Sequence, residues 1–144
     1  MVTLQSAIAA ELPYLRAEAE ARMLDTFDIG VPSGGYTYDP AANGGTGGDV
    51  ETIEPLFTTA GRVKVGGGLA AREAEAGGRT VTTVIRELHI PVDSDAVPVG
   101  AVAVCTAVDP TSDPTLLGAR LRLSGPAPGS QTTARRLQVE EILT

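Results

Sequence analysis

Residues 119–143, ARLRLSGPAPGSQTTARRLQVEEIL, hold two alternating runs joined by a turn-forming segment. In the first run Leu121 and Leu123 alternate with arginines, which is the period of a half-buried β-strand. The segment PAPGS predicts a turn, because proline and glycine favour the backbone angles that turns require. In the second run Leu137 and Val139 share one face. The stretch therefore predicts two strands whose apolar sides face a common core.

Runs of the same kind recur earlier in the chain. One of them starts at Met23, where Asp25 is the one residue that breaks the apolar alternation. With the C-terminal pair they predict about six strands separated by turns. This pattern is typical of a small antiparallel β-barrel or sandwich, formed here by a single domain over residues 1–144. The four further strands are expected near residues 24–31, 50–65, 79–92 and 99–108.

The N-terminal segment 3–23 predicts an amphipathic helix. Apolar residues recur there at steps of three or four, which places them on one helix face. Pro13 lies inside the pattern and predicts a kink or a break. We expect the apolar face to pack against the sheet, with packing on a neighbouring subunit as the alternative. The stripe consists of Leu4, Ile8, Leu12, Leu15, Ala19 and Met23.

Two glycine-rich segments, 32–49 and 66–78, are predicted to be flexible loops. The first contains the turn signals Asp39-Pro40 and Asn43-Gly44. The second is a short acidic segment of helix-forming residues between two glycine clusters, and glycine adds backbone freedom. We therefore expect both segments to project from the barrel.

The composition limits the partners that the chain can bind. With 18 acidic and 11 basic residues the net charge is −7, and Lys64 is the one lysine. Binding to a phosphate backbone is driven by lysine and arginine, so tight DNA binding is not expected. No apolar run approaches the roughly 20 residues of a membrane span, and the N-terminus lacks the pattern of a secretion signal. The sequence thus predicts a soluble cytosolic protein.

The residue types that usually perform chemistry form no recognisable set. His89 lies within a predicted strand, and Cys105 lies in an apolar run as a buried thiol. The acidic clusters DSD and DPTSD could hold calcium weakly, but such residues are typical of turns. The adjacent Glu140 and Glu141 would point to opposite faces of a strand. We therefore expect no enzyme activity, no cofactor and no metal ion.

Three segments together resemble a known family. They are DPTLLGARLRLSGPAPGSQTTARRLQVEEI near the C-terminus, the strand LFTTAGRVKV, and the block ELHIPVDSDAVPVGAVAVCTAV. As a set they resemble the head–tail connector proteins of tailed phages of actinobacteria, in particular the head-closure or stopper proteins of long-tailed siphophages. The glycine-rich insertion 32–49 is long for this family.

The resemblance implies a structural role in the phage neck. It implies a homo-oligomeric ring between the portal and its adaptor on one side and the tail terminator and tail tube on the other. Such a ring is assembled in the host cytoplasm, closes the channel after packaging and docks the tail, and genomic DNA passes through it without sequence-specific binding. The alternatives are an adaptor or tail-terminator ring of the same neck. An alternative of another class is a monomeric β-barrel binding module.

The resemblance also leads to two sets of candidate residues. Arg135, Arg136, Glu140 and Glu141 are expected to form ion pairs between subunits, with a solvated barrel edge as the alternative. The segment 66–78 is the first candidate for a loop that closes the channel, and 32–49 is the second. The channel-closing candidates are Gly66, Gly67, Gly68, Leu69, Arg72, Glu73, Glu75, Gly77 and Gly78.

Overall fold

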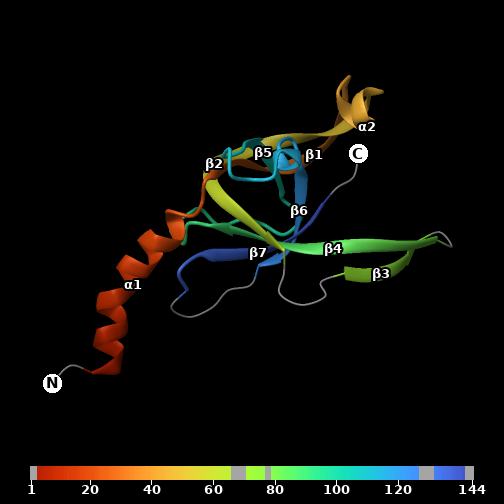
Figure 1. The fold of residues 1–144 in the computed structure, drawn as a ribbon. Coiled ribbons are helices and arrows are strands. Elements are labelled where there is room, and N and C mark those ends of the chain that lie inside the picture. The colour runs from red at the N-terminus through yellow and green to blue at the C-terminus, as the bar shows by residue number, and fades with distance from the viewer. Residues whose placement is uncertain (1–2, 66–70, 77–78, 127–131, 142–144) are drawn as a thin grey trace.

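The computed structural model describes residues 3–65, 71–76, 79–126 and 132–141, and these are mainly β-structure with one long helix (Figure 1). The order of elements follows the predicted strands closely. The elements are α1 (Leu4–Glu20), β1 (Asp25–Asp39), the short helix α2 (Ala42–Gly45), β2 (Gly48–Val65), β3 (Ala71–Ala76), β4 (Arg79–Ile90), β5 (Val102–Ala107), a 3-10 turn η1 (Pro114–Leu116), β6 (Arg120–Pro126) and β7 (Arg135–Glu141).

Six of the strands form a closed antiparallel ring. The sheet runs β2-β1-β5-β6-β7-β4, and β2 pairs in addition with β4, so that the last strand returns to the first. The closing register joins Arg62 to His89 and Val65 to Arg86. Closure leaves none of these six strands at a sheet edge, which is the defining property of a barrel. The predicted small antiparallel β-barrel is therefore confirmed, and we call this ring the barrel.

The core of the barrel comes from the alternation that marks β6 and β7 in the sequence. Leu121 and Leu137 are 0% and 2% exposed, and Leu123 lies opposite Val139 in the register. Phe27 on β1 completes the same cluster from the facing wall. Because successive residues of a strand point to opposite sides, one apolar residue in two suffices to fill the interior. The core contains a single aromatic ring among its fully buried side chains in the described residues.

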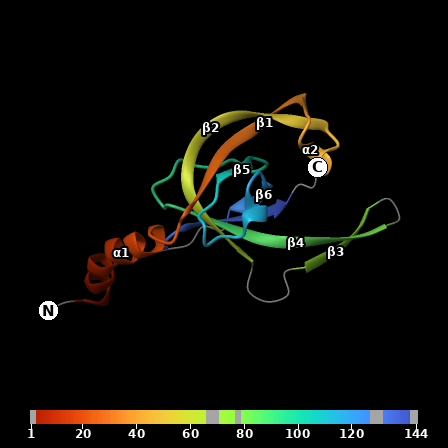
Figure 2. The same cartoon turned by 45° about the horizontal axis from the view of Figure 1, so that its top comes forward.

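The helix α1 corrects one expectation. It runs through Pro13 without ending, and Thr3 caps its start by accepting a hydrogen bond from the Ser6 amide at 3.1 Å. The helix ends at Glu20, and none of its residues is buried, so the predicted packing of the apolar stripe against the sheet is wrong for the helix itself. Met23, the last residue of the stripe, lies beyond the end of the helix and is 6% exposed. Both views show α1 extending away from the barrel (Figure 1, Figure 2). Its periodicity indicates a helix correctly but carries no information about what the apolar face meets.

The predicted loop 32–49 is largely regular structure. β1 continues to Asp39, β2 starts at Gly48, and α2 lies between them, so a loop over the whole segment is wrong. Irregular pairing between Pro32 and Tyr36 accommodates the proline, which cannot donate to a ladder, and Gly34 takes a φ of 83°. Pairing along the partner strand thus overrides the turn-forming composition.

The predicted loop 66–78 also contains a strand. Residues Ala71–Ala76 form β3 and pair with β4, so neither a loop nor a helix is correct for them. Alanine and glutamate favour helix only by fractions of a kcal/mol per residue, and pairing with the long strand β4 outweighs that preference. The rest of this segment, 66–70 and 77–78, lies outside the described residues.

The barrel core predicts a sharp contrast between two leucines. Leu121→Ala removes a side chain that is 0% exposed and should lower the free energy of unfolding by about 2–5 kcal/mol, through lost burial and the cavity left behind. Leu117→Ala, at a site 56% exposed, is the matched control and should change it by less than about 1 kcal/mol. Urea unfolding followed by circular dichroism measures both. Equal losses would mean that Leu121 is not part of the core.

Candidate functional site

A polar cavity of about 720 Å³ lies at one end of the barrel, lined by the start of β1, by β2, β4 and β7, and by the segment 111–116. Arg86 on β4 and Glu141 on the neighbouring strand β7 both line it and form an ion pair, with Nη2 and Oε2 3.0 Å apart. The Nε of Arg86 is buried and has no hydrogen-bond acceptor among the described residues. Arg22 and Arg62 also line the cavity. The cavity is therefore lined by both basic and acidic side chains, and the ion pair between Arg86 and Glu141 connects β4 to β7.

Asp25, which breaks the apolar alternation of β1, lines the same cavity and is 6% exposed. Its Oδ1 accepts hydrogen bonds from the amide of Asp109 at 2.9 Å and from the hydroxyl of Ser112 at 2.7 Å. A buried carboxylate is tolerated only when it is hydrogen-bonded in this way. Asp25 thus attaches the 109–112 turn to the first strand, a role that the sequence did not reveal.

The acidic cluster DPTSD serves the same turn. Asp109 accepts hydrogen bonds from the amide and hydroxyl of Thr111, and these bonds lower the pKa of its carboxyl group. Asp113 accepts in the same way from Thr115, at 2.9 and 2.7 Å, and these bonds lower the pKa of Asp113 as well, with a smaller contribution from Arg86. Both carboxylates act as turn acceptors, and the described residues contain no group of three or more candidate metal ligands.

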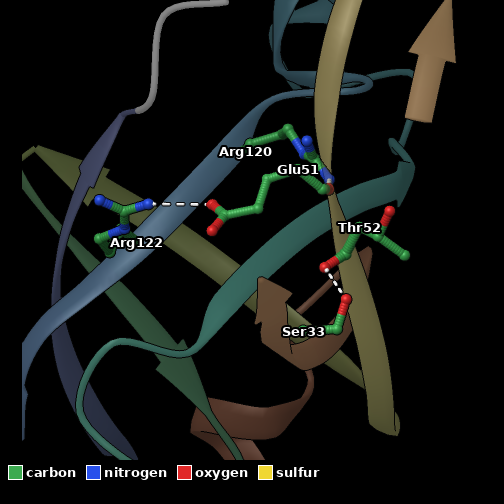
Figure 3. A network of polar contacts seen from close by, with 5 residues as sticks. All are labelled: Ser33, Glu51, Thr52, Arg120 and Arg122. Carbon is green, nitrogen blue, oxygen red and sulfur yellow. Dashed lines mark hydrogen bonds and ion pairs between the residues drawn. The ribbon is translucent and has the colours of Figure 1, made fainter. Parts of the chain in front are cut away.

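A second hollow, of about 530 Å³, lies between the far half of the β1–β2 ribbon and strands β5 and β6. Two arginines of β6 hold the ribbon at this point (Figure 3). Arg120 donates from Nη2 to the carbonyl of Glu51 at 2.8 Å, and Arg122 pairs with the Glu51 carboxylate at 3.2 Å. Burial is the main cause that lowers the pKa of Arg120, and the charges of Glu51 and Asp39 oppose it.

The ribbon itself is stabilised by hydroxyl contacts between its two strands. Ser33 donates to the carbonyl of Thr52 at 3.0 Å (Figure 3). The hydroxyls of Thr37 and Thr52 are 2.9 Å apart. Tyr36 and Tyr38, near its tip, are 70% and 63% exposed. The hollow beneath the ribbon is a concave surface with apolar and polar groups, a setting in which small ligands or peptides bind.

The helix α1 touches the barrel through its C-terminal half. The Nε of Arg16 donates to the carbonyl of Thr132 at 3.1 Å, and a hollow of about 320 Å³ separates this part of the helix from Val92 and Asp93. Leu4 and Leu15 are 79% and 47% exposed. An apolar stripe that the described part of the chain leaves exposed is of the kind that serves association in other proteins.

The predicted subunit-interface residues divide into two pairs. Arg135 donates to the carbonyls of Val92, Ser94 and Asp95 of its own chain, at 2.6–3.1 Å, and Glu141 pairs with Arg86. Arg136 and Glu140 lie on the outer face of β7 and are exposed. Because β7 pairs with both β4 and β6, it is not an edge strand, but the alternative that these residues lie on a solvated surface of the barrel stays open. A role between subunits remains a prediction for Arg136 and Glu140.

Of the predicted channel-closing residues, Arg72, Glu73 and Glu75 lie on β3, whereas the glycines and Leu69 lie outside the described residues. Strand pairing brings these three together with the first half of β4. They are therefore positioned by a sheet register and not by a loop.

His89 and Cys105 have ordinary structural contacts. The Nε2 of His89 is 3.0 Å from the carboxylate of Glu87 on the same strand. Cys105 is 1% exposed, and burial, together with the charge of Asp25, raises the pKa of its thiol against the opposing effect of a hydrogen bond to the Ala107 carbonyl. A thiol with a raised pKa stays protonated near neutral pH, so Cys105 is not a ready nucleophile.

Fold and surfaces define a small closed β-barrel whose described polar residues mostly hold its own strands and turns together. Residues 15–140 match the model of DUF6093, a family of unknown function, and the chain belongs to that family. No curated protein and no solved structure matches the chain significantly. In the described residues no helix has the length and apolar character needed to cross a membrane.

Asp25 yields a direct prediction. Asp25→Ala should lower the free energy of unfolding by about 1–3 kcal/mol, because the Asp109 amide and the Ser112 hydroxyl lose their acceptor in a buried place. Asp49→Ala, at an exposed position of β2, is the matched control and should change it little. Urea unfolding gives both values. If the two variants are equally stable, the carboxylate of Asp25 does not hold the turn.

Cys105 yields a second prediction. In the folded protein at pH 8 its thiol should react with Ellman's reagent about a hundredfold or more slowly than in guanidinium, because it is buried and its pKa is raised. The time course of absorbance in the two solutions measures this ratio. Similar rates would show that the barrel opens at β5 or that the thiol is exposed.

Proposed function

We propose that this protein is a structural subunit of the neck of a tailed phage, forming a ring between the portal or its adaptor and the tail. In this role it closes the DNA channel after packaging and docks the tail, as the resemblance to head-closure proteins implies. The observation that carries the proposal is that the barrel bears two projecting elements, α1 and the β3–β4 hairpin, on opposite sides (Figure 1, Figure 2). Elements of this kind are suited to contacts with neighbouring subunits.

The charge of the chain supports the same role. A net charge of −7 on each subunit repels phosphate, and a ring through which DNA must slide benefits from a wall that does not bind it. Several acids of the described residues hold the protein's own structure together: Asp25, Asp109 and Asp113 accept hydrogen bonds in turns, and Glu51 and Glu141 form ion pairs. An adaptor or tail-terminator ring of the same neck would share these features.

A second candidate rests on the hollow beneath the β1–β2 ribbon. Its volume of about 530 Å³ and the exposed Tyr36 and Tyr38 nearby suit a monomeric binding module for a sugar or a peptide. A monomeric binding module would not account for the exposed apolar residues of α1, such as Leu4 and Leu15. The ring is therefore the preferred function.

The proposal is tested in particles of the phage whose genome encodes the chain. A nonsense mutation in its gene should give packaged heads without tails that lose their DNA, and the same gene supplied in trans should restore infectious particles. Cryo-electron microscopy of the restored neck should show a ring of this chain between adaptor and tail. A ring at the adaptor or terminator position would overturn the head-closure role, and absence of the chain from the particle would overturn the neck function altogether.

A further inference from the structure

The wall of the barrel carries a row of basic side chains at the place where the barrel closes. Arg62 on β2 lies directly opposite His89 on β4, and His89 lies directly opposite Arg136 on β7. Side chains at directly opposite positions lie on one face of a sheet, so these three form a row across three neighbouring strands. Lys64 lies two residues after Arg62 and therefore on the same face. We call Arg62, Lys64, His89 and Arg136 the basic patch.

The basic patch is on the outer side of the barrel wall. His89 lies between Leu88 and Ile90, which are both buried in the core, and Arg136 precedes the buried Leu137. Because successive residues of a strand point to opposite sides, the row faces away from the core. The two arginines and the lysine of the patch are exposed. The patch is therefore accessible to a partner.

The charges of the patch are mostly unpaired. Glu87 lies on the same face of β4, and its carboxylate is 3.0 Å from Nε2 of His89. Arg62, Lys64 and Arg136 form no ion pair with any residue that the structure describes. Like charges side by side on neighbouring strands destabilise a sheet. In a chain of net charge −7, such a group of unpaired bases indicates a surface for an acidic partner.

The helix α1 carries acids on the face that holds its apolar stripe. Glu11 and Glu18 are exposed and seven residues apart, which places them on one helix face two turns apart. Leu15 lies between them on that face and is 47% exposed. Neither glutamate forms an ion pair within the described part of the chain. Both views show α1 extending away from the barrel, so it does not cover the basic patch of its own chain (Figure 1, Figure 2).

The spacing of the two glutamates matches the spacing of the two arginines. Seven helical residues span roughly 10 Å along the axis, because each residue rises about 1.5 Å. Arg62 and Arg136 are two strands apart, which is also roughly 10 Å, because neighbouring strands lie about 4.8 Å apart. A helix laid across the three strands thus places one glutamate at each arginine and Leu15 above the middle strand. The aliphatic stems of the arginines provide apolar surface to cover Leu15 there.

We infer that α1 docks on the basic patch of a second copy of this chain, with the two glutamates of the helix facing the two arginines of the row. A phosphate backbone would also pair with these bases, but it would leave the apolar residues of α1 exposed. Helix and patch are different surfaces, so the contact is head-to-tail and closes into a ring when the rotation between copies permits. This inference rests on the proposed ring and names the contact that joins its subunits.

Charge reversal tests the contact. One variant, Arg62→Glu with Arg136→Glu, reverses the patch. The other, Glu11→Arg with Glu18→Arg, reverses the helix. Each variant alone should associate about a hundredfold more weakly than the wild type, because like charges then oppose each other across the contact. Sedimentation velocity over a concentration series measures association, and circular dichroism verifies that each variant is folded.

Two controls separate the contact from a general effect of charge. The variant that combines all four substitutions has the net charge of the wild type, and it should recover association because both surfaces are then reversed together. Asp49→Arg with Glu54→Arg applies the charge change of the helix variant at exposed positions of β2 and should associate like the wild type. A labelled DNA duplex, followed by fluorescence anisotropy, should not bind to the wild type at physiological salt.

Cross-linking tests which surfaces meet. Cys105 is buried, so a cysteine placed on an exposed surface is the reactive thiol. Leu15→Cys places it on the docking face of the helix, and Gln138→Cys places it beside Arg136 on the outer face of β7. A bis-maleimide of roughly 10 Å span, the distance between packed layers, should join a mixture of the two variants into dimers and neither variant alone. Tyr38→Cys, which is exposed on the β1–β2 ribbon, replaces Gln138→Cys as the control and should give no dimer.

Several outcomes would overturn the inference. They are undiminished association in both charge-reversed variants, failure of the combined variant to recover it, and a wild-type chain that stays monomeric and uncross-linked up to on the order of 1 mM. DNA binding that is lost on reversal of the patch would assign the patch to nucleic acid instead. Each of these concerns the contact alone. Failure of the neck function would show as absence of the chain from particles, so the two failures are distinguishable.

Discussion

The pairing of β2 with β4 is the constraint on which the rest of the structure depends. Four register positions, from Arg62–His89 to Val65–Arg86, turn a sheet with two free edges into a closed barrel. Without this pairing the leucines of β6 and β7 would still alternate, but the sheet would have no opposite wall against which to bury them. Closure also fixes where β4 leaves the barrel, and hence where its pairing with β3 begins. The closed wall surrounds the core on all sides, so a small core with few aromatic residues is enough to fill it.

The sequence predicts the strands well, because a β-strand that is buried on one side has apolar residues at every second position. Leu121, Leu123, Leu137 and Val139 all lie where that period places them, at 0–3% exposure. The same reasoning fails for 32–49 and 71–76, where glycine, proline or helix-forming residues occur but pairing with a long neighbouring strand decides the conformation. Local composition carries no information about a partner strand that is distant in the sequence.

Less of the candidate site could be predicted. Asp25 is visible in the sequence as a break in the alternation, yet nothing there indicates that it accepts from Asp109 and Ser112, more than 80 positions away. Arg135 and Glu141 are expected at an interface because they lie on the last predicted strand, where the resemblance suggests ion pairs between subunits and arginine suits such contacts. In the structure Arg135 instead donates hydrogen bonds to carbonyls of residues 92–95, and Glu141 pairs with Arg86. The sequence pattern of α1 predicts an apolar stripe on one helix face. It does not predict that this face is left exposed, because that depends on the direction in which the helix leaves the barrel.

The continuity of β4 has a mechanical consequence. The strand is shared between the β3–β4 hairpin and the barrel. A pull on the hairpin along the direction of β4 would therefore act as shear on the ladders that join β4 to β7 and to β2. Antiparallel hydrogen bonds lie across the strand direction, so this load falls on all of them together and not on one after another. Two residues of the β4 stretch that pairs with β7, Leu88 and Ile90, are also buried in the core. Separating β4 from the barrel by such a pull therefore requires both ladders to shear together.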